Sequence, residues 1–484
     1  MDFSNTYIDL GQRFYEKSLP TPVAQPSLLL WNKQLATQLK ITTALEKDDE
    51  MLAAIFAGNR LLEGTEPISC AYAGHQFGSF NPQLGDGRAH LLGEIIDDQG
   101  KRRDLQLKGS GQSRFSRGGD GRCAIGPALR EFIMSEAMLA LGVPTTQCLA
   151  VVASGEPVYR EKALPGAIVS RVASSHIRVG TFQYFAAQND IESLQALSDY
   201  SIDRHFPNVR KLPGDPIVNF LDAVIRKQIK LICEWLRVGF IHGVMNTDNT
   251  SICGETIDYG PCAMINVYDP ATVFSSIDKR GRYSFGNQPH IANWNMARFA
   301  ESLLPLFSNN SEDIKKQFIE LIQDFPVRFQ HAYQTMMAQK LGFVKKHDKD
   351  PSLVAQILTR MEEQKLDYTL TFHSLSQSLS DQSKDVALQT QLGSAFTLWR
   401  ERIKLQSAKD GEAQALMQSV NPVVIPRNHH IEAVLASCEM DNDMREAKRI
   451  LTVLRNPYEQ SEATKRYQVP PEDNDIGYRT FCGT

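Results

Sequence analysis

Residues 241–249 read Ile-His-Gly-Val-Met-Asn-Thr-Asp-Asn, and an acidic tripeptide, Asp258-Tyr259-Gly260, begins nine residues after Asn249. His242 and Asn249 have the spacing of an H-x-D-x-x-x-x-N loop, which supplies oxygen ligands to a Mg²⁺-nucleotide complex together with a following acidic tripeptide. The carboxylate and amide oxygens of these two turns predict a site for nucleotide-dependent group transfer. The apolar helical pattern that precedes the loop suggests that a buried helix delivers the loop to that site.

One position departs from the pattern found in kinases. Where a kinase has its catalytic Asp, this chain has Val244, which cannot accept a proton from a substrate hydroxyl. Asp248, next to Asn249, is the candidate replacement for that base. Because Gly, Asn and Asp are also common turn residues, the loop alone is equally compatible with plain turn chemistry.

The segment before this loop predicts strands joined by glycine-rich turns. Gly85-Asp86-Gly87-Arg88 is a turn whose backbone amides could approach a phosphate, with Arg88 adding positive charge; an ordinary hairpin turn is the alternative. Residues 104–108 alternate as a strand that ends on Lys108, in the manner of the phosphate-contacting lysine of kinases, although most such lysines are solvated.

A long loop and a helix follow this strand. Residues 109–126, GSGQSRFSRGGDGRCAIG, predict an anion-binding loop because arginines stand among glycines, while Asp120-Gly121 is also a good plain turn. The apolar spacing of residues 128–141 predicts a helix. Glu131 is expected to face inward and pair with Lys108, and Glu136 to be solvent-exposed.

The remaining pattern predicts an α+β, protein-kinase-like fold with two lobes. Residues 143–172 read as two or three strands (146–152, 156–160 and 166–172), and residues 215–239 as a long amphipathic helix leading into the His242 loop. Arg171 and Arg178 stand at the expected lobe junction, where they could bind phosphates or pair with carboxylates such as Glu161.

These elements suggest four regions. Residues 1–60, with helical patterns at 28–39 and 47–57, are an extension packed on the catalytic unit. Residues 61–172 form a small, mostly antiparallel β N-lobe with one helix, and residues 173–345 a large helical C-lobe with an activation-type segment. Residues 346–484 form an added helical region, with helices expected at 352–363, 386–405 and 431–454, a polar linker at 374–384, and Cys482 in the tail.

Composition narrows the possible settings of the chain. Its 484 residues carry a net charge of -4, which favours neither nucleic acid nor an anionic membrane as a partner. No signal peptide or membrane-length apolar run is visible, so a cytoplasmic location is expected. No two cysteines form a C-x-x-C pair, which argues against a zinc ribbon or a disulfide scaffold. The eight cysteines are at positions 70, 123, 148, 233, 253, 262, 438 and 482.

Taken together, the motifs resemble the selenoprotein O (YdiU) family of kinase-like proteins along the whole chain. The matching stretches are CAYAGHQFGSFNPQLGDGR, DLQLKGSGQSRFSRGGDGR, REFIMSEAM, HGVMNTDN, DYGP at 258–261, GRYSFGNQP, NPVVIPRNH at 421–429, and a cysteine third from the end. The resemblance implies ATP bound in a flipped orientation and transfer of AMP to Ser, Thr or Tyr hydroxyls of proteins with release of pyrophosphate. Related proteins also transfer UMP from UTP.

The resemblance also implies residue roles. Asp248 would accept the proton, Asn249 and Asp258 would hold Mg²⁺ or Mn²⁺, and redox-homeostasis proteins would be possible targets. The nucleotide would be bound by Gly85, Gly87, Arg88, Lys108, Asp120, Gly121, Arg171, Arg178 and Asp258. Two other functions remain open from the residues: a conventional phosphotransferase that uses Asp248 as a displaced base, and an inactive ATP-binding scaffold.

One implied feature is missing. Some relatives form a redox-sensitive disulfide between the C-terminal chalcogen residue and a cysteine in the activation segment, but the corresponding stretch here, residues 273–276, is Val-Phe-Ser-Ser. Cys482 keeps the tail position, and its nearest candidate partner, Cys262, lies much earlier in the segment. We therefore do not expect an intramolecular redox switch, and a mixed disulfide of Cys482 with a substrate or glutathione is the alternative.

Overall fold

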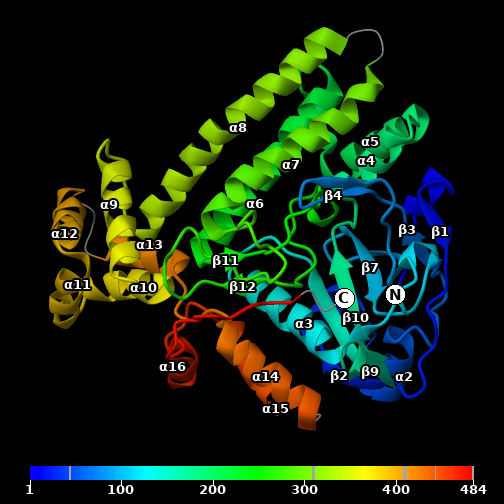
Figure 1. The fold of residues 1–484 in the computed structure, drawn as a ribbon, viewed down its shortest axis with the longest axis horizontal. Coiled ribbons are helices and arrows are strands. Elements are labelled where there is room, and N and C mark those ends of the chain that lie inside the picture. The colour runs from blue at the N-terminus through cyan, green and yellow to red at the C-terminus, as the bar shows by residue number, and fades with distance from the viewer. Residues whose placement is uncertain (43–44, 308–310, 407–410, 442, 482–484) are drawn as a thin grey trace.

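The structure is a computed structural model that describes residues 1–42, 45–307, 311–406, 411–441 and 443–481 (Figure 1). A sheet lies on the right of that view, and helices make up most of the rest. This mixture of an antiparallel sheet and many helices agrees with the predicted α+β class. No helix within these ranges is long and apolar enough to cross a membrane.

The sheet has eight strands, all paired antiparallel, in the order β1-β3-β6-β7-β10-β9-β2, with β8 paired to β10. Residues 147–159 form one continuous strand where the sequence predicted two, because pairing with β10 continues beyond Gly155. The strands are β1 (Tyr15–Lys17), β2 (Ser27–Trp31), β3 (Ile68–Cys70), β6 (Ala89–Ile96), β7 (Arg102–Lys108), β8 (Cys123–Ala124), β9 (Gln147–Tyr159) and β10 (Ala163–Ala173).

The first 60 residues contribute β1 and β2 to this sheet. The helix predicted over 28–39 is wrong in its first part, because residues 27–31 form β2 and α1 (Lys33–Gln38) starts only after Asn32, which caps it. A short apolar run does not distinguish strand from buried helix, and here pairing with β9 decides. The second predicted helix is present as α2 (Asp49–Phe56).

Helices cover both faces of the sheet. Helix α3 (Ile125–Ala140) packs on one face, where Leu129 and Phe132 belong to the same buried cluster as Val151. Helix α2 covers the other face, where Phe56 belongs to a cluster with Val152. Neighbouring residues of β9 therefore point into different cores, as the alternation of strand side chains requires.

The helical part is built around α6 (Pro216–Val238), the long helix predicted from its apolar periodicity. Asp215 caps its start, Pro216 occupies the first turn, and Gly239 ends it in the left-handed conformation. The chain then passes through β11 (Phe240–Ile241), which pairs with β12 (Ala263–Met264), directly into the His242 loop. Around α6 lie α4 (Val179–Ala187), α5 (Ile191–His205), α7 (Gln288–Leu303) and α8 (Ser311–Lys340).

The C-terminal region contains more breaks than the sequence suggested. The helix predicted over 386–405 is two helices separated at Gly393, whose φ is 59°, and the one predicted over 431–454 is also divided. In the predicted polar linker at 374–384, residues 374–378 belong to a helix and residues 382–384 form a 3₁₀ turn. The helices are α9 (Asp350–Glu363), α10 (Tyr368–Ser378), α11 (Asp385–Leu392), α12 (Ser394–Leu405), α13 (Glu412–Val420), α14 (Asn428–Asp441), α15 (Arg445–Leu454) and α16 (Glu462–Gln468).

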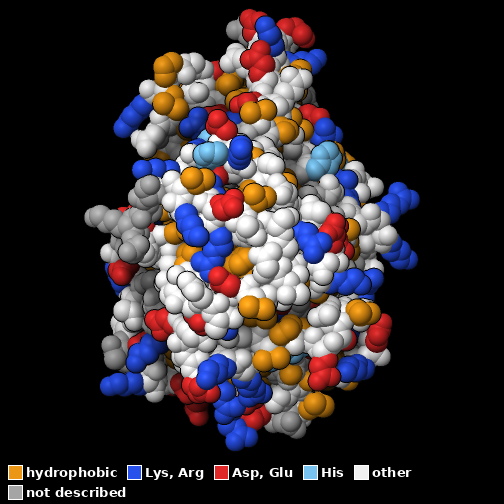
Figure 2. All heavy atoms as spheres, turned by 90° about the vertical axis from the view of Figure 1, so that its left-hand side faces the viewer, with side chains coloured by type: hydrophobic (Ala, Val, Ile, Leu, Met, Phe, Trp, Pro, Cys, Tyr) orange, Lys and Arg blue, Asp and Glu red, His pale blue; other side chains and the backbone are white. Residues whose placement is uncertain are grey.

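Figure 1 shows α9 to α13 gathered at the left end of the molecule, whereas α14 and α15 return to lie beside α3. The surface seen from that left end carries interspersed acidic and basic side chains with scattered hydrophobic ones (Figure 2). Such a mixed face is typical of ordinary solvated surface.

Candidate active site

The His242 loop is held by buried hydrogen bonds. His242 Nε2 lies 2.9 Å from the carbonyl of Ile257, and its Nδ1 accepts from the amide of Val244 at 3.3 Å. Burial lowers the pKa of His242, which favours the neutral ring that this pattern needs. His242 therefore shapes the loop, and the neighbouring 3₁₀ turn Thr247–Asn249 presents the acidic group.

Asp248 has one carboxylate oxygen bound and one without a partner. Gln76 Nε2 donates to Oδ2 at 3.2 Å, while Oδ1 is buried and takes no hydrogen bond from any part of the chain that the structure describes. Burial raises the pKa of Asp248 to about 6, although the Gln76 hydrogen bond and the charge of Arg178 oppose this. A carboxylate with an uncommitted oxygen and a pKa near neutrality is suited to accept a proton.

A glycine makes this arrangement possible. Gln76 lies on a two-stranded hairpin, β4 (Gly74–Gln76) with β5 (Ser79–Asn81), that packs on the loop. A Cβ at Gly74 would lie 2.7 Å from Asp248 Oδ1 and 2.9 Å from its Cβ. Only glycine allows the hairpin to approach the carboxylate this closely.

Four charged groups from four separate segments meet in one buried cluster. Lys108 Nζ, at the end of β7, lies 2.7 Å from Glu131 Oε2 on α3 and 2.7 Å from Asp258 Oδ1. Arg171, on β10, donates from Nε to Glu131 Oε1 at 2.7 Å and from Nη2 to Asp258 Oδ1 at 2.6 Å. The expected Lys108–Glu131 ion pair is thus present, and Arg171 pairs with these carboxylates rather than with Glu161.

Asp258 is unusual in the pKa of its carboxyl group and in its backbone conformation. Burial disfavours its charge, yet Arg171 and Lys108 hold its pKa well below the usual range, so it is ionised at neutral pH. Its φ of 62° places a non-glycine residue in the left-handed region. Such a conformation typically costs about 1–3 kcal/mol and persists only where the surroundings impose it.

Arg178 connects the glycine-rich turn to the catalytic loop. Its guanidinium lies 4.4 Å from the ring centre of Tyr72, and its Nη1 donates to the carbonyl of Asp248 at 3.1 Å. Its Nη2 lies 3.7 Å from Asp86 Oδ1, in the middle of the Gly85–Arg88 turn. The Nε of Arg178 is buried and has no partner among the described residues, which leaves a donor for a bound group.

The two glycine-rich stretches pack against each other. A Cβ at Gly85 would lie 2.2 Å from the ring of Phe115, and one at Gly87 would lie 2.6 Å from its carbonyl oxygen. Gly121 has a φ of 69° and touches the backbone of Gly111 so closely that a Cβ there would overlap it. The loop that begins after Lys108 therefore lies directly on the turn that carries Arg88.

Asp120 is not part of the buried cluster in this structure. Its carboxylate accepts from Arg160 Nη1 at 2.8 Å and from the amide of Arg122 at 2.9 Å. The pKa of Asp120 is lowered, with the Arg160 hydrogen bond as the main cause. Cys482 lies outside the described residues.

The donor atoms expected to bind a metal fit a hard divalent cation. Asn249 donates through Nδ2 to the carbonyl of Val244 at 3.1 Å, and its Oδ1 accepts no hydrogen bond from the described residues. The same holds for Asp258 Oδ2, whereas its Oδ1 is occupied. A carboxylate and an amide oxygen suit Mg²⁺ or Mn²⁺, with water or phosphate completing the shell. The described residues contain no group of three or more His, Cys, Asp or Glu able to hold a metal unaided.

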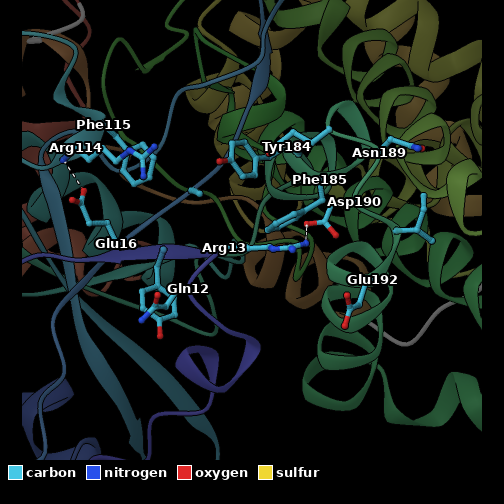
Figure 3. A pocket seen from close by; sticks show the side chains of 14 residues that line it. Gln12, Arg13, Glu16, Arg114, Phe115, Tyr184, Phe185, Asn189, Asp190 and Glu192 are labelled. Carbon is cyan, nitrogen blue, oxygen red and sulfur yellow. Dashed lines mark hydrogen bonds and ion pairs between the residues drawn. The ribbon is translucent and has the colours of Figure 1, made fainter.

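A cavity of about 680 Å³ lies close by, between the N-terminal segment and the α4–α5 junction (Figure 3). Figure 3 shows Arg13 reaching across to Asp190, and their ion pair measures 2.8 Å. Ala71 lines this cavity, whereas the ring of the next residue, Tyr72, lies against Arg178. The lining residues of the cavity thus include neither Tyr72 nor Arg178.

Sequence reasoning missed three site residues and misplaced one. Gln76, Gly74 and Asp86 were not singled out for their contacts, because each acts through partners that only the fold brings close. Glu136, expected to be solvated, is buried and accepts from Asn32 Nδ2 at 2.5 Å and Arg455 Nη2 at 2.9 Å. The second partner lies 319 residues away in the sequence.

Comparison with known proteins places this site in a family. The family model described as "Protein adenylyltransferase SelO" matches residues 1–455. The chain belongs to the SelO family. It is 51% identical to "Protein nucleotidyltransferase YdiU" of Teredinibacter turnerae over 100% of both chains. It is 48% identical to the protein of that name from Agrobacterium fabrum over 100% of both chains. With the one from Maridesulfovibrio salexigens it shares 46% identity, over 100% of this chain and 98% of the relative.

Proposed function

We propose that this member of the SelO family transfers AMP from ATP to Ser, Thr or Tyr hydroxyls of protein substrates and releases pyrophosphate, with UMP transfer from UTP as an alternative reaction. The carrying observation is Asp248, which has a pKa near neutrality and one oxygen that finds no partner in the part of the chain that the structure describes. Val244, at the position of the kinase base, offers no competing acceptor.

The kinase-like arrangement is part of the same proposal. It is supported by a strand lysine paired with a helix glutamate, and by a catalytic loop that follows a long buried helix. The conformation of Asp258, at the start of the segment after that loop, agrees with a role near the reacting groups.

In the proposed reaction, Asp248 Oδ1 accepts the proton of the substrate hydroxyl. The hydroxyl oxygen forms a bond to the α-phosphorus, and the bond from that phosphorus to the α,β-bridging oxygen breaks. Pyrophosphate leaves with the electron pair and the negative charge. We infer that Lys108, Arg171 and Arg178, which lie around Asp258 and Asp248, stabilise this charge, and electrostatic stabilisation is usually the largest contribution to such catalysis.

The charge balance of the site supports a metal requirement. The cations Lys108, Arg171 and Arg178 are matched by the carboxylates Glu131, Asp258 and Asp86. These groups alone add no net positive charge for a triphosphate. A divalent cation held by Asn249 and Asp258 would supply that charge and orient the phosphates.

The experiment is incubation of the full chain with ATP labelled at the α- or the γ-phosphate, with Mg²⁺, Mn²⁺ or EDTA, followed by detection of labelled protein. We expect labelling from the α-phosphate only and a loss of about two to four orders of magnitude in Asp248→Ala. The control is Asp203→Ala, which removes a surface carboxylate. Labelling from the γ-phosphate would instead support a phosphotransferase, and ATP binding without labelling an inactive scaffold.

The setting of the reaction is also proposed. The seven cysteines within the described residues are all free, which supports a reducing, cytoplasmic compartment. Protein substrates, including the redox-homeostasis proteins that the family resemblance suggests, are the proposed partners, and neither nucleic acid nor a membrane is. Labelling of a total protein extract, with Asp248→Ala as the blank, would identify the targets.

A further inference from the structure

The β4–β5 hairpin is fixed to the catalytic loop at three successive residues. The amide of His75 donates to Thr247 Oγ1 at 2.7 Å, Gln76 donates to Asp248, and the amide of Phe77 donates to Asn246 Oδ1 at 3.1 Å. The tip of the hairpin nevertheless exposes large apolar side chains. Phe77 is 37% exposed and Phe80 is 41% exposed. An exposed aromatic surface thus begins one residue from the side chain that binds Asp248.

The aromatic surface continues onto α7. Phe80 lies 4.9 Å from His75 between ring centres, and His75 lies 5.3 Å from Trp294. The ring of Trp294 also has two guanidinium groups near it, Arg282 at 4.8 Å and Arg298 at 5.0 Å. Stacking on an aromatic ring holds each of these cations in a defined position.

The charge of this surface is not balanced locally. Among the described residues no carboxylate pairs with Arg282, because nearby Asp278 accepts instead from the amides of residues 282 and 283 at 2.9 and 2.7 Å. Lys279 and Arg280 are exposed, and neither forms an ion pair within the described chain. Arg298 is the exception, since it pairs with Glu301. Arg282 therefore lies against the aromatic surface without a carboxylate partner among the described residues, and Lys279 and Arg280 are exposed cations three and two positions before it in the chain.

We propose that this surface, formed by Phe77, Phe80, Trp294, Lys279, Arg280 and Arg282, docks an acidic segment of the protein substrate beside the residue that is modified. The proposal rests on the proposed function and names the substrate class of that site. Charge complementarity selects acidic residues, and the hydrogen bonds of the hairpin to the catalytic loop place the docked segment next to Asp248. Because an extended chain advances about 3.3 Å per residue, the acidic residues stand within a few positions of the acceptor hydroxyl.

The test uses three synthetic peptides that share one Ser and differ only in the flanking residues, which are Glu, Gln or Lys. The full chain is compared with the double variant Lys279→Glu/Arg280→Glu, which leaves every residue of the proposed catalytic machinery intact. We expect the KM for AMP transfer to the Glu peptide to rise about tenfold while kcat stays within about twofold, and the Lys peptide to become the better substrate. A matched control is Lys315→Glu/Lys316→Glu on α8, which changes net charge equally at a remote exposed site and leaves the preference unchanged.

A binding measurement separates this proposal from the proposed function. Fluorescence anisotropy of a labelled Glu peptide needs no transfer, so it reports docking even if no peptide is adenylylated. Weaker binding by the charge-reversal variant and by Phe77→Ser/Phe80→Ser supports the surface. Unchanged binding in both variants overturns it. It is also overturned if a single-stranded oligonucleotide, and not the Glu peptide, shows the charge-dependent binding.

Discussion

The buried surroundings of Asp248 raise the pKa of its carboxyl group toward neutrality. With a pKa of about 6, the carboxylate is protonated below that pH and able to accept a proton above it. We expect kcat/KM to rise through pH 6 and then level off. Because the Gln76 hydrogen bond lowers this pKa, Gln76→Leu should shift the acid limb to higher pH. A pH–rate profile of both proteins measures the shift.

The control for this prediction is Gln83→Leu, an exposed glutamine that follows the same hairpin. Its acid limb should coincide with that of the unchanged protein. An acid limb that stays in place in Gln76→Leu would show that another group sets the pH dependence.

Glu131 pairs with two buried cations, Lys108 and Arg171, whose only other carboxylate partner among the described residues is Asp258. Glu131→Ala should lower the free energy of unfolding by about 3–5 kcal/mol, the range expected when one member of a buried ionic group is removed. Burial opposes the charge of Glu131, but Arg171 and Lys108 leave its pKa lowered. Its contribution is therefore present above the unfolded pKa, near 4.3, and lost as pH falls below it.

Denaturant unfolding at pH 7 and at successively lower pH tests the predicted loss of stability and its dependence on pH. The difference between Glu131→Ala and the unchanged protein should narrow on acidification. Glu192→Ala, at an exposed position on α5, should change stability by less than about 0.5 kcal/mol. Equal effects of the two substitutions would contradict the structural role given to the cluster.

At the scale of elements, the tail forms a single parallel β-bridge, between Thr480 and Ser275, with the segment that follows Asp258. Thr480 donates its amide to Phe274 at 2.8 Å, accepts at its carbonyl from Ser276 at 2.9 Å, and donates its hydroxyl to the carbonyl of Pro261 at 2.7 Å. The stretch that lacks a cysteine is therefore joined to the tail by backbone hydrogen bonds.

Removing this bridge should loosen the 273–283 segment. Thr480→Pro abolishes the amide donor, and we expect limited proteolysis within 273–283 to become at least about fivefold faster, since cleavage follows the population of the open form. Thr480→Val keeps the backbone bonds and loses only the hydroxyl contact, so its cleavage rate should stay close to that of the unchanged protein. Equal cleavage of all three proteins would show that the tail does not hold this segment.

The elements that could be predicted are those whose signals are local. Helices α3 and α6 follow from apolar periodicity, α6 also from the proline in its first turn, and β7 from alternation that ends on Lys108. Strand β2 was missed because its pairing partner is more than a hundred residues away. The role of the β4–β5 hairpin was missed for the same reason, since its contacts to the catalytic loop span about 170 residues.

At the scale of the whole molecule, the C-terminal helices support the helix that carries Glu131. Helices α14 and α15 pack on α3, where Arg130 pairs with Glu432 and Arg455 with Glu136. A Cβ at Gly126 would lie 2.1 Å from Glu439 Oε1. The start of α3 therefore approaches the Glu439 side chain of α14 closely. The last part of the chain thus packs against the helix that contributes Glu131 to the candidate site.

Arg455→Ala should weaken this support. Burial raises the pKa of Glu136, and Arg455 is the main group that opposes the rise. Without it we expect a loss of about 1–2 kcal/mol at pH 8, because the arginine is partly exposed and its ion pair is screened. The loss should be smaller at pH 4.5, where Glu136 of the variant is protonated.

Thermal unfolding at the two pH values measures this effect. The double variant Glu136→Gln/Arg455→Ala should recover part of the stability at pH 8, because it leaves no buried carboxylate without its cation. If the double variant recovers no stability at pH 8, Arg455 stabilises the protein in another way, for example through its packing.

The overall architecture could be predicted only to the level of a small antiparallel sheet followed by a large helical part. The predicted domain limits and the kinase-like arrangement remain predictions. Of the ionic cluster, only the Lys108–Glu131 pair was predicted from the sequence, whereas the pairing of Arg171 with Glu131 and Asp258 was not. The sequence also did not predict that the two positive and two negative charges of this cluster balance, because the pairs form between segments that are far apart in the chain.

The packing of α15 on α3 has a consequence for synthesis on the ribosome. Helix α3 ends at residue 140, but its supporting helix is complete only at residue 454. At translation rates of about 5–20 residues per second, roughly 15–60 s pass between the synthesis of α3 and that of the helix that packs on it. During that interval α3 is exposed in the nascent chain, and the ionic cluster around Glu131 forms without the support of the C-terminal helices.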